Sequence, residues 1–310
     1  MSNRTCAVIL AGGEGKRMKS NRPKVLAEVL FKPLIKWVID AAEEAGITDI
    51  CVVTGSKREF VEEYIDSLET DNITTVYQAE RLGTGHAVMQ AMDFLKQHSG
   101  ESVIILNGDA PFISSDTIKS VIEAGKNAAC TVVSAEVEDP FGYGRIVRKA
   151  DGISLEAIVE EKEADDEIRR IKEVNSGAYC FEADALIDAL TKIPRSEKTG
   201  EYYLTDTIEI IQKSGRPVNA FMAESSDSAL GANDCIQLCQ LNEIARMRIL
   251  EKHMRNGVII PCTDGVMIGP DVTIGANAVI LPATVIRGKS SVASFCEVGP
   301  GVLIEDQTIE

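Results

Sequence analysis

The sequence lacks several features that would place the protein in a familiar class. No apolar run approaches the ~20 residues that a membrane-spanning helix needs, and the amino terminus has no apolar core of a signal peptide. The net charge is −16, with no basic stripe outside one loop to neutralise a nucleic-acid backbone. These absences predict a cytoplasmic protein that binds neither membranes nor nucleic acid.

Cysteine clusters and histidines are also scarce. The eight cysteines form no Cys-x-x-Cys pair, and only three histidines are present. Cys235 and Cys239 share a helical face, but no acid or histidine is placed to complete a metal site with them. Buried thiols are therefore expected there.

The most informative segment is the glycine-rich stretch at residues 10–18, Leu-Ala-Gly-Gly-Glu-Gly-Lys-Arg-Met, followed by Pro23-Lys24. It lies between an apolar run typical of a buried parallel strand and a helical pattern from about Pro33 to Ala45. Neither a Gly-Lys-Ser/Thr ending nor a G-x-G-x-x-G spacing is present, which excludes the two commonest phosphate loops. Residues 12–24 carry five bases and one acid, so a polyanion site is favoured over an ordinary turn.

The first part of the chain alternates short apolar strands with helical patterns. This alternation predicts an α/β fold with a mostly parallel sheet, covered by helices on both faces, whose ligands bind at the carboxyl ends of the strands. The strands are expected at Ala7–Leu10, Ile50–Thr54, Thr74–Gln78 and Val103–Leu106, with helices from Pro33 and near Arg58–Leu68 and Gly85–Gln97.

Two polar motifs follow predicted strands. Gly83 and Gly85 lie just before a helix, where backbone N–H groups and the helix dipole favour close approach of a ligand. Asp109 ends a buried strand and is placed to hold Mg²⁺ against phosphates. An ordinary helix entry and a turn aspartate are the alternatives.

Later polar positions interrupt apolar segments. Glu160 ends an apolar run, and Asn175-Ser176 lies inside another, where an unpaired amide would be costly. Asn233-Asp234 begins an amphipathic helix that runs from Cys235 to about Arg255.

Beyond this helix, β-branched residues recur with a strict period of six. No ordinary helix or strand has that period, and it predicts a parallel β-helix built from hexapeptides. The recurring residues are Ile268, Ile274, Ile280, Ile286, Val292, Val298 and Ile304.

Together these motifs resemble the sugar-nucleotide pyrophosphorylases, and most closely the bacterial bifunctional N-acetylglucosamine-1-phosphate uridyltransferases. The likeness covers about residues 4–256, followed by a repeat of the family's type. It implies a Rossmann-like nucleotidyltransferase domain at 1–230, a linking helix at 231–256 and a short left-handed β-helix at 257–310. A homo-oligomer is expected, and the resemblance makes it a trimer.

The resemblance also implies roles for individual residues. It assigns catalysis to Arg17 and Lys24, and Mg²⁺ to Asp109 and Asn233. Asn107 stands where the family usually carries a tyrosine, and His86 is left without a role. The nucleotide would contact Leu10, Ala11, Gly12, Gly13, Gln78, Gly83, Thr84, Asn107 and Gly108, and the sugar would contact Gly144, Glu160, Asn175, Glu201 and Tyr203.

The implied reaction transfers UMP from UTP to N-acetylglucosamine 1-phosphate and releases pyrophosphate. No acetyltransferase activity is expected, since all three histidines precede the repeat and the rest of that family domain has no counterpart in this sequence. Two alternatives remain: a sibling enzyme that uses glucose 1-phosphate, and a non-catalytic regulatory or scaffold subunit.

Overall fold

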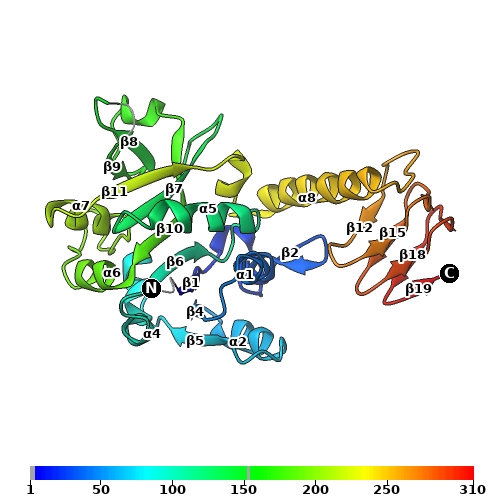
Figure 1. The fold of residues 1–310 in the computed structure, drawn as a ribbon, viewed down its shortest axis with the longest axis horizontal. Coiled ribbons are helices and arrows are strands. Elements are labelled where there is room, and N and C mark those ends of the chain that lie inside the picture. Colours follow the sequence, from blue (N-terminus) through cyan, green and yellow to red (C-terminus); the bar gives the residue numbers. More distant parts are fainter. Residues whose placement is uncertain (1–3, 152–153) are drawn as a thin grey trace. The chain divides into compact units, whose positions relative to one another are not determined.

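A computed structural model describes residues 4–151 and 154–310, which form two compact units (Figure 1). The first unit comprises Met1–Leu26 and Leu34–Gly231, and the second comprises Ala27–Pro33 and Ala232–Glu310. The second unit therefore includes a short segment from the amino-terminal part of the chain as well as the helix and the repeats.

The first unit is built on a nine-stranded sheet with the order β11-β7-β10-β6-β1-β4-β5, and β8 and β9 attach beside β10. The strands β6, β1, β4 and β5 are parallel, as the sequence predicts, whereas β10 runs antiparallel to both of its neighbours. The strands are β1 (Thr5–Ala11), β4 (Ile50–Thr54), β5 (Ile73–Tyr77), β6 (Ser102–Asn107), β7 (Cys130–Glu136), β8 (Arg145–Arg148), β9 (Leu155–Val159), β10 (Glu173–Glu182) and β11 (Val218–Met222).

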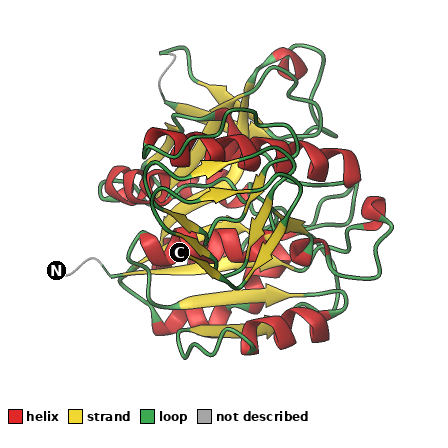
Figure 2. Ribbon diagram, turned by 90° about the vertical axis from the view of Figure 1, so that its right-hand side faces the viewer, coloured by secondary structure: helices red, strands yellow, loops and turns green. Residues whose placement is uncertain are grey.

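Helices cover both faces of this sheet (Figure 2). On one face α1 (Leu34–Glu44), α2 (Arg58–Asp66) and α5 (Ser115–Gly125) pack over alternate side chains of the buried strands. On the other face lie α3 (Thr84–Gln90), α4 (Met92–Gln97), α6 (Ala183–Leu190) and α7 (Asp206–Lys213). Alternation along a strand puts successive residues on opposite faces, so each strand supplies both cores.

The prediction of a single helix near Gly85–Gln97 is wrong. The segment forms two helices that meet at Ala91, which has φ −87° and ψ 11°. The apolar residues Val88, Ala91 and Leu95 continue across this break and stay buried, so the helical pattern persists in the sequence although the backbone does not form one helix.

In the second unit, α8 (Cys235–Arg255) begins at Asp234, whose side chain accepts hydrogen bonds from the N–H groups of Ile236 and Gln237. Cys235 and Cys239 are exposed, so the expectation of buried thiols is wrong. The first buried side chain of α8 is that of Leu241, so the first turns of the helix contribute no buried side chain.

The hexapeptide repeat is confirmed as short parallel strands. Met267 pairs with Val285 and Val285 with Leu303, so each pairing steps three hexapeptides along the chain. The apolar positions of the repeat, among them Ile268 and Ile286, pack into one core. The strands are β12 (Met267–Ile268), β13 (Thr273–Ile274), β14 (Val279–Ile280), β15 (Val285–Arg287), β16 (Ser291–Val292), β17 (Glu297–Val298), β18 (Leu303–Glu305) and β19 (Thr308–Ile309), and β2 (Glu28–Val29) and β3 (Lys32–Pro33) form a hairpin in the same unit.

Among the described residues, no helix has the length and apolar character that would let it cross a membrane.

Candidate active site

The carboxyl ends of β1 and β6 lie side by side and bring two predicted motifs together. Leu10 is in register with Asn107, and Gly108 donates its N–H to Leu10 O at 3.0 Å. A Cβ at residue 108 would lie 3.1 Å from the same oxygen, so glycine lets the two chains approach closely. Asp109 follows directly, beside the start of the glycine-rich loop.

The glycine-rich loop packs against two other strand ends. A Cβ at Gly12 would lie 2.9 Å from Gln78 Oε1, and one at Gly55 would lie 2.4 Å from Gly12 O. At Gly13, by contrast, a Cβ would meet open space. The loop thus lies directly on β4 and on the residue after β5, where a Cβ at residue 12 or residue 55 would collide.

Gln78 is buried and held by several polar contacts. Its Nε2 donates to Gly83 O at 3.1 Å and lies 3.1 Å from His86 Nδ1. His86 Nε2 in turn lies 3.3 Å from Gln90 Nε2. His86 therefore orients the glutamine rather than facing a ligand alone, which gives a role to a residue that the sequence left without one.

The segment before α3 is fastened to the segment before α7. Gly85 donates its N–H to Tyr202 O at 2.8 Å, and Thr84 Oγ1 accepts from the N–H of Leu204 at 3.1 Å. A Cβ at Gly83 would lie 2.5 Å from Tyr202 O. The Thr84 hydroxyl thus accepts a structural bond, and close packing explains the glycine at residue 83.

The two basic residues that are predicted to act on the phosphates, Lys24 and Arg17, lie in different surroundings. The Lys24 ammonium forms an ion pair with the Asp109 carboxylate, and both side chains are largely buried. Gly15 has φ +62° and a Cβ there would lie 2.8 Å from Lys24 Cβ, so the loop folds back on this lysine. Arg17 is exposed within a short 3-10 helix at Lys16–Met18. Lys24 is therefore fixed, while Arg17 faces solvent.

Three residues that are predicted to bind the sugar lie close together at β8, β9 and β10. Asn175 donates its N–H to Gly144 O at 2.8 Å. A Cβ at residue 144 would lie 3.6 Å from Glu160 Oε2 and 3.7 Å from Asn175 Cβ. Thr205, which the sequence did not single out, donates its hydroxyl to Glu160 Oε1 at 3.0 Å. The spacing of these residues in the chain gives no sign of this convergence.

Acidic groups crowd this part of the first unit. Burial raises the pKa of Glu160, partly offset by the hydrogen bond from Thr205. Burial also raises the pKa of Asp206 to about 6, with further contributions from the charges of Glu163, Glu160 and Glu209. A cationic or hydrogen-bond-donating ligand would relieve this repulsion.

The Asn107 side chain packs against a bulge in β10. The register of β10 against β7 shifts between Asn175 and Tyr179, and Gly177 in this bulge has φ +80°. A Cβ at residue 177 would lie 2.0 Å from Asn107 Nδ2, so only glycine fits against this amide. Asn107 is thus packed between β1 and the bulge.

The remaining predicted residues are less closely joined. Tyr203 donates its hydroxyl to Thr199 Oγ1 at 2.8 Å, and a Cβ at Gly83 would lie 3.0 Å from Glu201 Cβ. Ala11 is buried at the end of β1. Asn233 belongs to the second unit, where its N–H donates to Gln237 Oε1 at 2.7 Å.

The carboxylate oxygens of Asp109 are suitable ligands for a hard divalent cation that binds few protein groups. Among the described residues there is no group of three or more His, Cys, Asp or Glu side chains that could hold a metal ion alone. Mg²⁺ commonly takes one or two protein oxygens and completes its shell with water and substrate phosphates. Gly231 lies beside this residue, because a Cβ at 231 would be 3.2 Å from Asp109 O.

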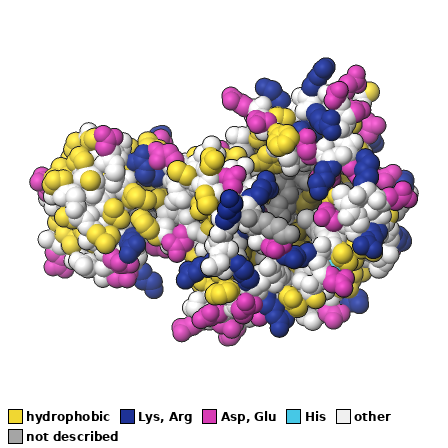
Figure 3. All heavy atoms as spheres, turned by 180° about the vertical axis from the view of Figure 1, so that it is seen from behind, with side chains coloured by type: hydrophobic (Ala, Val, Ile, Leu, Met, Phe, Trp, Pro, Cys, Tyr) yellow, Lys and Arg dark blue, Asp and Glu magenta, His cyan; other side chains and the backbone are white. Residues whose placement is uncertain are grey.

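Side chains of Lys and Arg gather around a hollow on one face of the first unit (Figure 3). In a chain of net charge −16 such a gathering favours an anionic ligand.

Comparison with protein families gives a match over most of the chain. The family described as nucleotidyl transferase matches residues 6–234. The "Bifunctional protein GlmU" of Caldanaerobacter subterraneus is 45% identical over 305 residues, which cover 98% of this chain and 65% of the relative. That of Acetivibrio thermocellus is 46% identical, covering 95% and 63%, and that of Clostridium botulinum is 41% identical, covering 98% and 68%. The chain thus spans about two thirds of the length of these relatives, and slightly less for the first two.

A solved structure shares the fold at low identity. A putative glucose-1-phosphate thymidylyltransferase of Bacillus anthracis superposes with a TM-score of 0.63 at 20% identity, covering 78% of this chain and 95% of the other. This similarity supports the fold alone.

Proposed function

The chain belongs to the nucleotidyl transferase family and, within it, to the proteins named bifunctional GlmU, and on that premise we propose that it transfers UMP from UTP to N-acetylglucosamine 1-phosphate. The products would be UDP-N-acetylglucosamine, a precursor for cell-wall synthesis, and pyrophosphate. The observation that carries the proposal is the common edge of β1 and β6, where the glycine-rich loop, Lys24 and Asp109 meet.

The proposed reaction needs no general base. A phosphate oxygen of the sugar phosphate is already anionic and attacks the α-phosphorus of UTP in line, while the bond to pyrophosphate breaks. The chain's own residues then have to position two polyanions and neutralise their charge. Loop N–H groups and Lys24 would do this, and exposed Arg17 would bind the leaving pyrophosphate.

Base recognition would fall to Gln78, Gly83 and Thr84. The contacts of Gln78 Nε2 with Gly83 O and His86 fix the amide, so its Oε1 projects toward Gly12. A fixed amide can distinguish a uracil edge, with its adjacent donor and acceptors, from other bases because an incorrect base would leave a buried polar group unpaired. The backbone around Gly12 and Gly13 would lie along the ribose.

The sugar would lie against Gly144, Glu160 and Asn175. The Glu160 carboxylate, held by Thr205, would accept from a sugar hydroxyl or the acetamido N–H. Asn175 Nδ2 donates to Tyr179 Oη at 2.5 Å and its Oδ1 accepts from the N–H of Gly177 at 3.0 Å, so its orientation is fixed.

Nucleotidyltransferases of this family generally depend on a divalent metal ion, and we propose Mg²⁺ held by Asp109. Asn233 as a second ligand stays a prediction of the resemblance. When bound, the ion would neutralise phosphate charge. A homo-oligomer, a cytoplasmic location and a lack of acetyltransferase activity stay predictions. The proposal is tested by pyrophosphate release from UTP with Mg²⁺, with N-acetylglucosamine 1-phosphate and glucose 1-phosphate supplied in separate reactions.

A further inference from the structure

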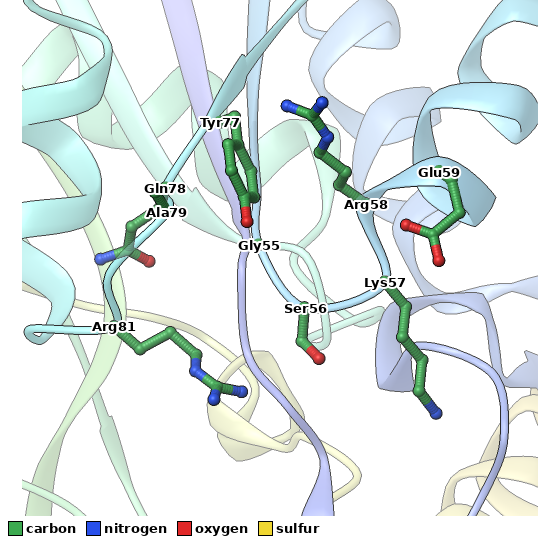
Figure 4. A pocket seen from close by; sticks show the side chains of 9 residues that line it. All are labelled: Gly55, Ser56, Lys57, Arg58, Glu59, Tyr77, Gln78, Ala79 and Arg81. Atoms are coloured by element: carbon green, nitrogen blue, oxygen red, sulfur yellow. The ribbon is translucent and has the colours of Figure 1, made fainter.

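A pocket of about 330 Å³ lies beside the glycine-rich loop in the first unit, and of its lining residues the proposed reaction uses Gln78 alone. It is called here the basic pocket and is shown in Figure 4. Its lining residues are Gly55, Ser56, Lys57, Arg58, Glu59, Tyr77, Gln78, Ala79 and Arg81. Three of these are cationic and one is acidic, although the whole chain carries a net charge of −16.

The cationic groups approach the pocket from different elements. Lys57 and Arg58 come from the start of α2, and Arg81 comes from the segment before α3. In Figure 4 the side chains of Arg81 and Lys57 lie on opposite sides of Ser56. The Arg58 guanidinium carbon lies 4.3 Å from the centre of the Tyr77 ring, which holds this arginine as one wall of the pocket.

The charge of Lys57 is only weakly compensated. Its Nζ donates to Ser20 O at 3.1 Å, and among the described residues no ion pair places a carboxylate on it. A neutral carbonyl leaves the full positive charge in place. Lys57 also precedes the first turn of α2 with φ 55°, and lysine has no acceptor atom with which to cap that turn, so an anion can accept from the N–H groups there.

The pocket is linked directly to the glycine-rich loop. Arg81 Nη1 lies 2.6 Å from Glu14 Oε2, and Glu14 is the single acid among residues 12–24. The pocket wall at Gly55 touches Gly12, and Lys57 holds the carbonyl of Ser20. A ligand that contacts Arg81 therefore competes with a residue of the loop.

We propose that the basic pocket binds a small phosphate-bearing anion, and that this anion draws Arg81 from Glu14 and weakens the hold of the glycine-rich loop on UTP. Phosphate is favoured because its several oxygens can accept at once from an arginine fork, a lysine and backbone N–H groups. The pocket has room for pyrophosphate or a nucleoside monophosphate as well as inorganic phosphate. Once Arg81 has moved to the anion, the Glu14 carboxylate would repel the triphosphate and lower the affinity for UTP. By linkage, bound UTP would lower the affinity for the anion by the same factor.

The coupling to UTP rests on the proposed function, but anion binding does not. Isothermal titration of inorganic phosphate, pyrophosphate and UMP, in separate experiments, into the full chain first without UTP and then saturated with UTP, both without sugar phosphate or metal, measures anion binding and its coupling to UTP. Lys57→Gly is the variant of choice, because glycine keeps the left-handed backbone at residue 57 and removes the ammonium together with its aliphatic stem. Lys192→Ala is the matched control, since Lys192 is an exposed lysine paired with Asp188 in another part of the unit.

The inference predicts that, without UTP, Lys57→Gly binds at least one of these probes about tenfold more weakly than the wild type and Lys192→Ala, with a much smaller change in UTP affinity in the absence of the anion. Glu14→Gln should keep anion binding but lose its effect on UTP. No binding by the wild type without UTP, or equal binding by Lys57→Gly without UTP, would overturn the inference. An equal loss of UTP affinity in Lys57→Gly would also overturn it, because the pocket would then be part of the nucleotide site.

The two proposals fail in different ways. If UTP does not bind at all, the proposed function fails, and the same titrations on the free protein still decide whether Lys57 supports an anion site.

Discussion

The Lys24 ammonium is paired with the Asp109 carboxylate at the joint edge of β1 and β6. The pair joins a base that the glycine-rich loop carries to an acid that ends a buried strand, although the two residues are far apart in the sequence. One is positioned to neutralise phosphate and the other to hold a metal ion, so charge in this site is balanced before substrates arrive.

Lys24→Ala should reduce the rate of pyrophosphate release by about 10²-fold or more, because it removes charge that acts on the reacting phosphates. The protein should stay folded, because Asp109, with 26% of its side chain exposed, can be solvated once the ammonium is removed. Steady-state turnover and circular dichroism measure the two effects. A variant with near-normal turnover would remove Lys24 from the mechanism.

Asp109→Asn should raise the Mg²⁺ concentration that gives half-maximal rate, because a neutral amide oxygen is a weaker ligand than a carboxylate. Titration of the rate with Mg²⁺ measures this shift. Asp93→Asn serves as a control, since Asp93 is an exposed acid on α4. An unchanged Mg²⁺ dependence in Asp109→Asn would exclude this residue as a ligand.

The sequence predicted the motifs at the carboxyl ends of the parallel strands, but not the residues that pack against those motifs. The glycines at residues 12 and 108 and the amide at 78 lie in short motifs next to strands, where local pattern indicates their place. Gly55 and Gly177 are single glycines whose purpose depends on residues distant in the chain, and nothing local marks them. Thr205 and the Arg81–Glu14 pair were missed for the same reason.

Gly177→Ala should lower the free energy of unfolding by more than Gly215→Ala. The two glycines have nearly equal φ of +80° and +81°, so the backbone strain of an alanine is matched. A Cβ meets Asn107 Nδ2 only at residue 177, while residue 215 has open space. Alanine at a positive φ costs about 1 kcal/mol, and the collision should add about 1–3 kcal/mol at residue 177. Urea unfolding measures both, and equal losses would contradict the packing of Asn107 on the bulge.

Asp206→Asn should stabilise the protein at neutral pH. The folded pKa of about 6 lies above the ordinary value of 3.8, so the folded state binds the proton more tightly and stability falls as the pH rises from about 4 to 6. The asparagine variant lacks this loss and should be more stable by about 1 kcal/mol at pH 7, after allowance for solvent screening, with no gain below pH 4. Thermal unfolding across pH tests this, and a gain that does not depend on pH would contradict the charge repulsion.

Glu160→Gln should raise KM for the sugar phosphate while KM for UTP stays close to that of the wild type. The carboxylate lies by Gly144 and Asn175, so its loss should affect mainly the sugar phosphate. Thr205→Val should have a weaker effect in the same direction, because it removes only the hydrogen bond that holds Glu160. Equal changes for both substrates would show that the two residues act through the fold.

The central claim is tested most directly by pyrophosphate release from UTP and Mg²⁺ with N-acetylglucosamine 1-phosphate or glucose 1-phosphate. The account predicts rapid release with the acetylated sugar and little with glucose 1-phosphate. A preference for glucose 1-phosphate would contradict the assigned sugar, and no release with either sugar would contradict the uridyltransferase itself.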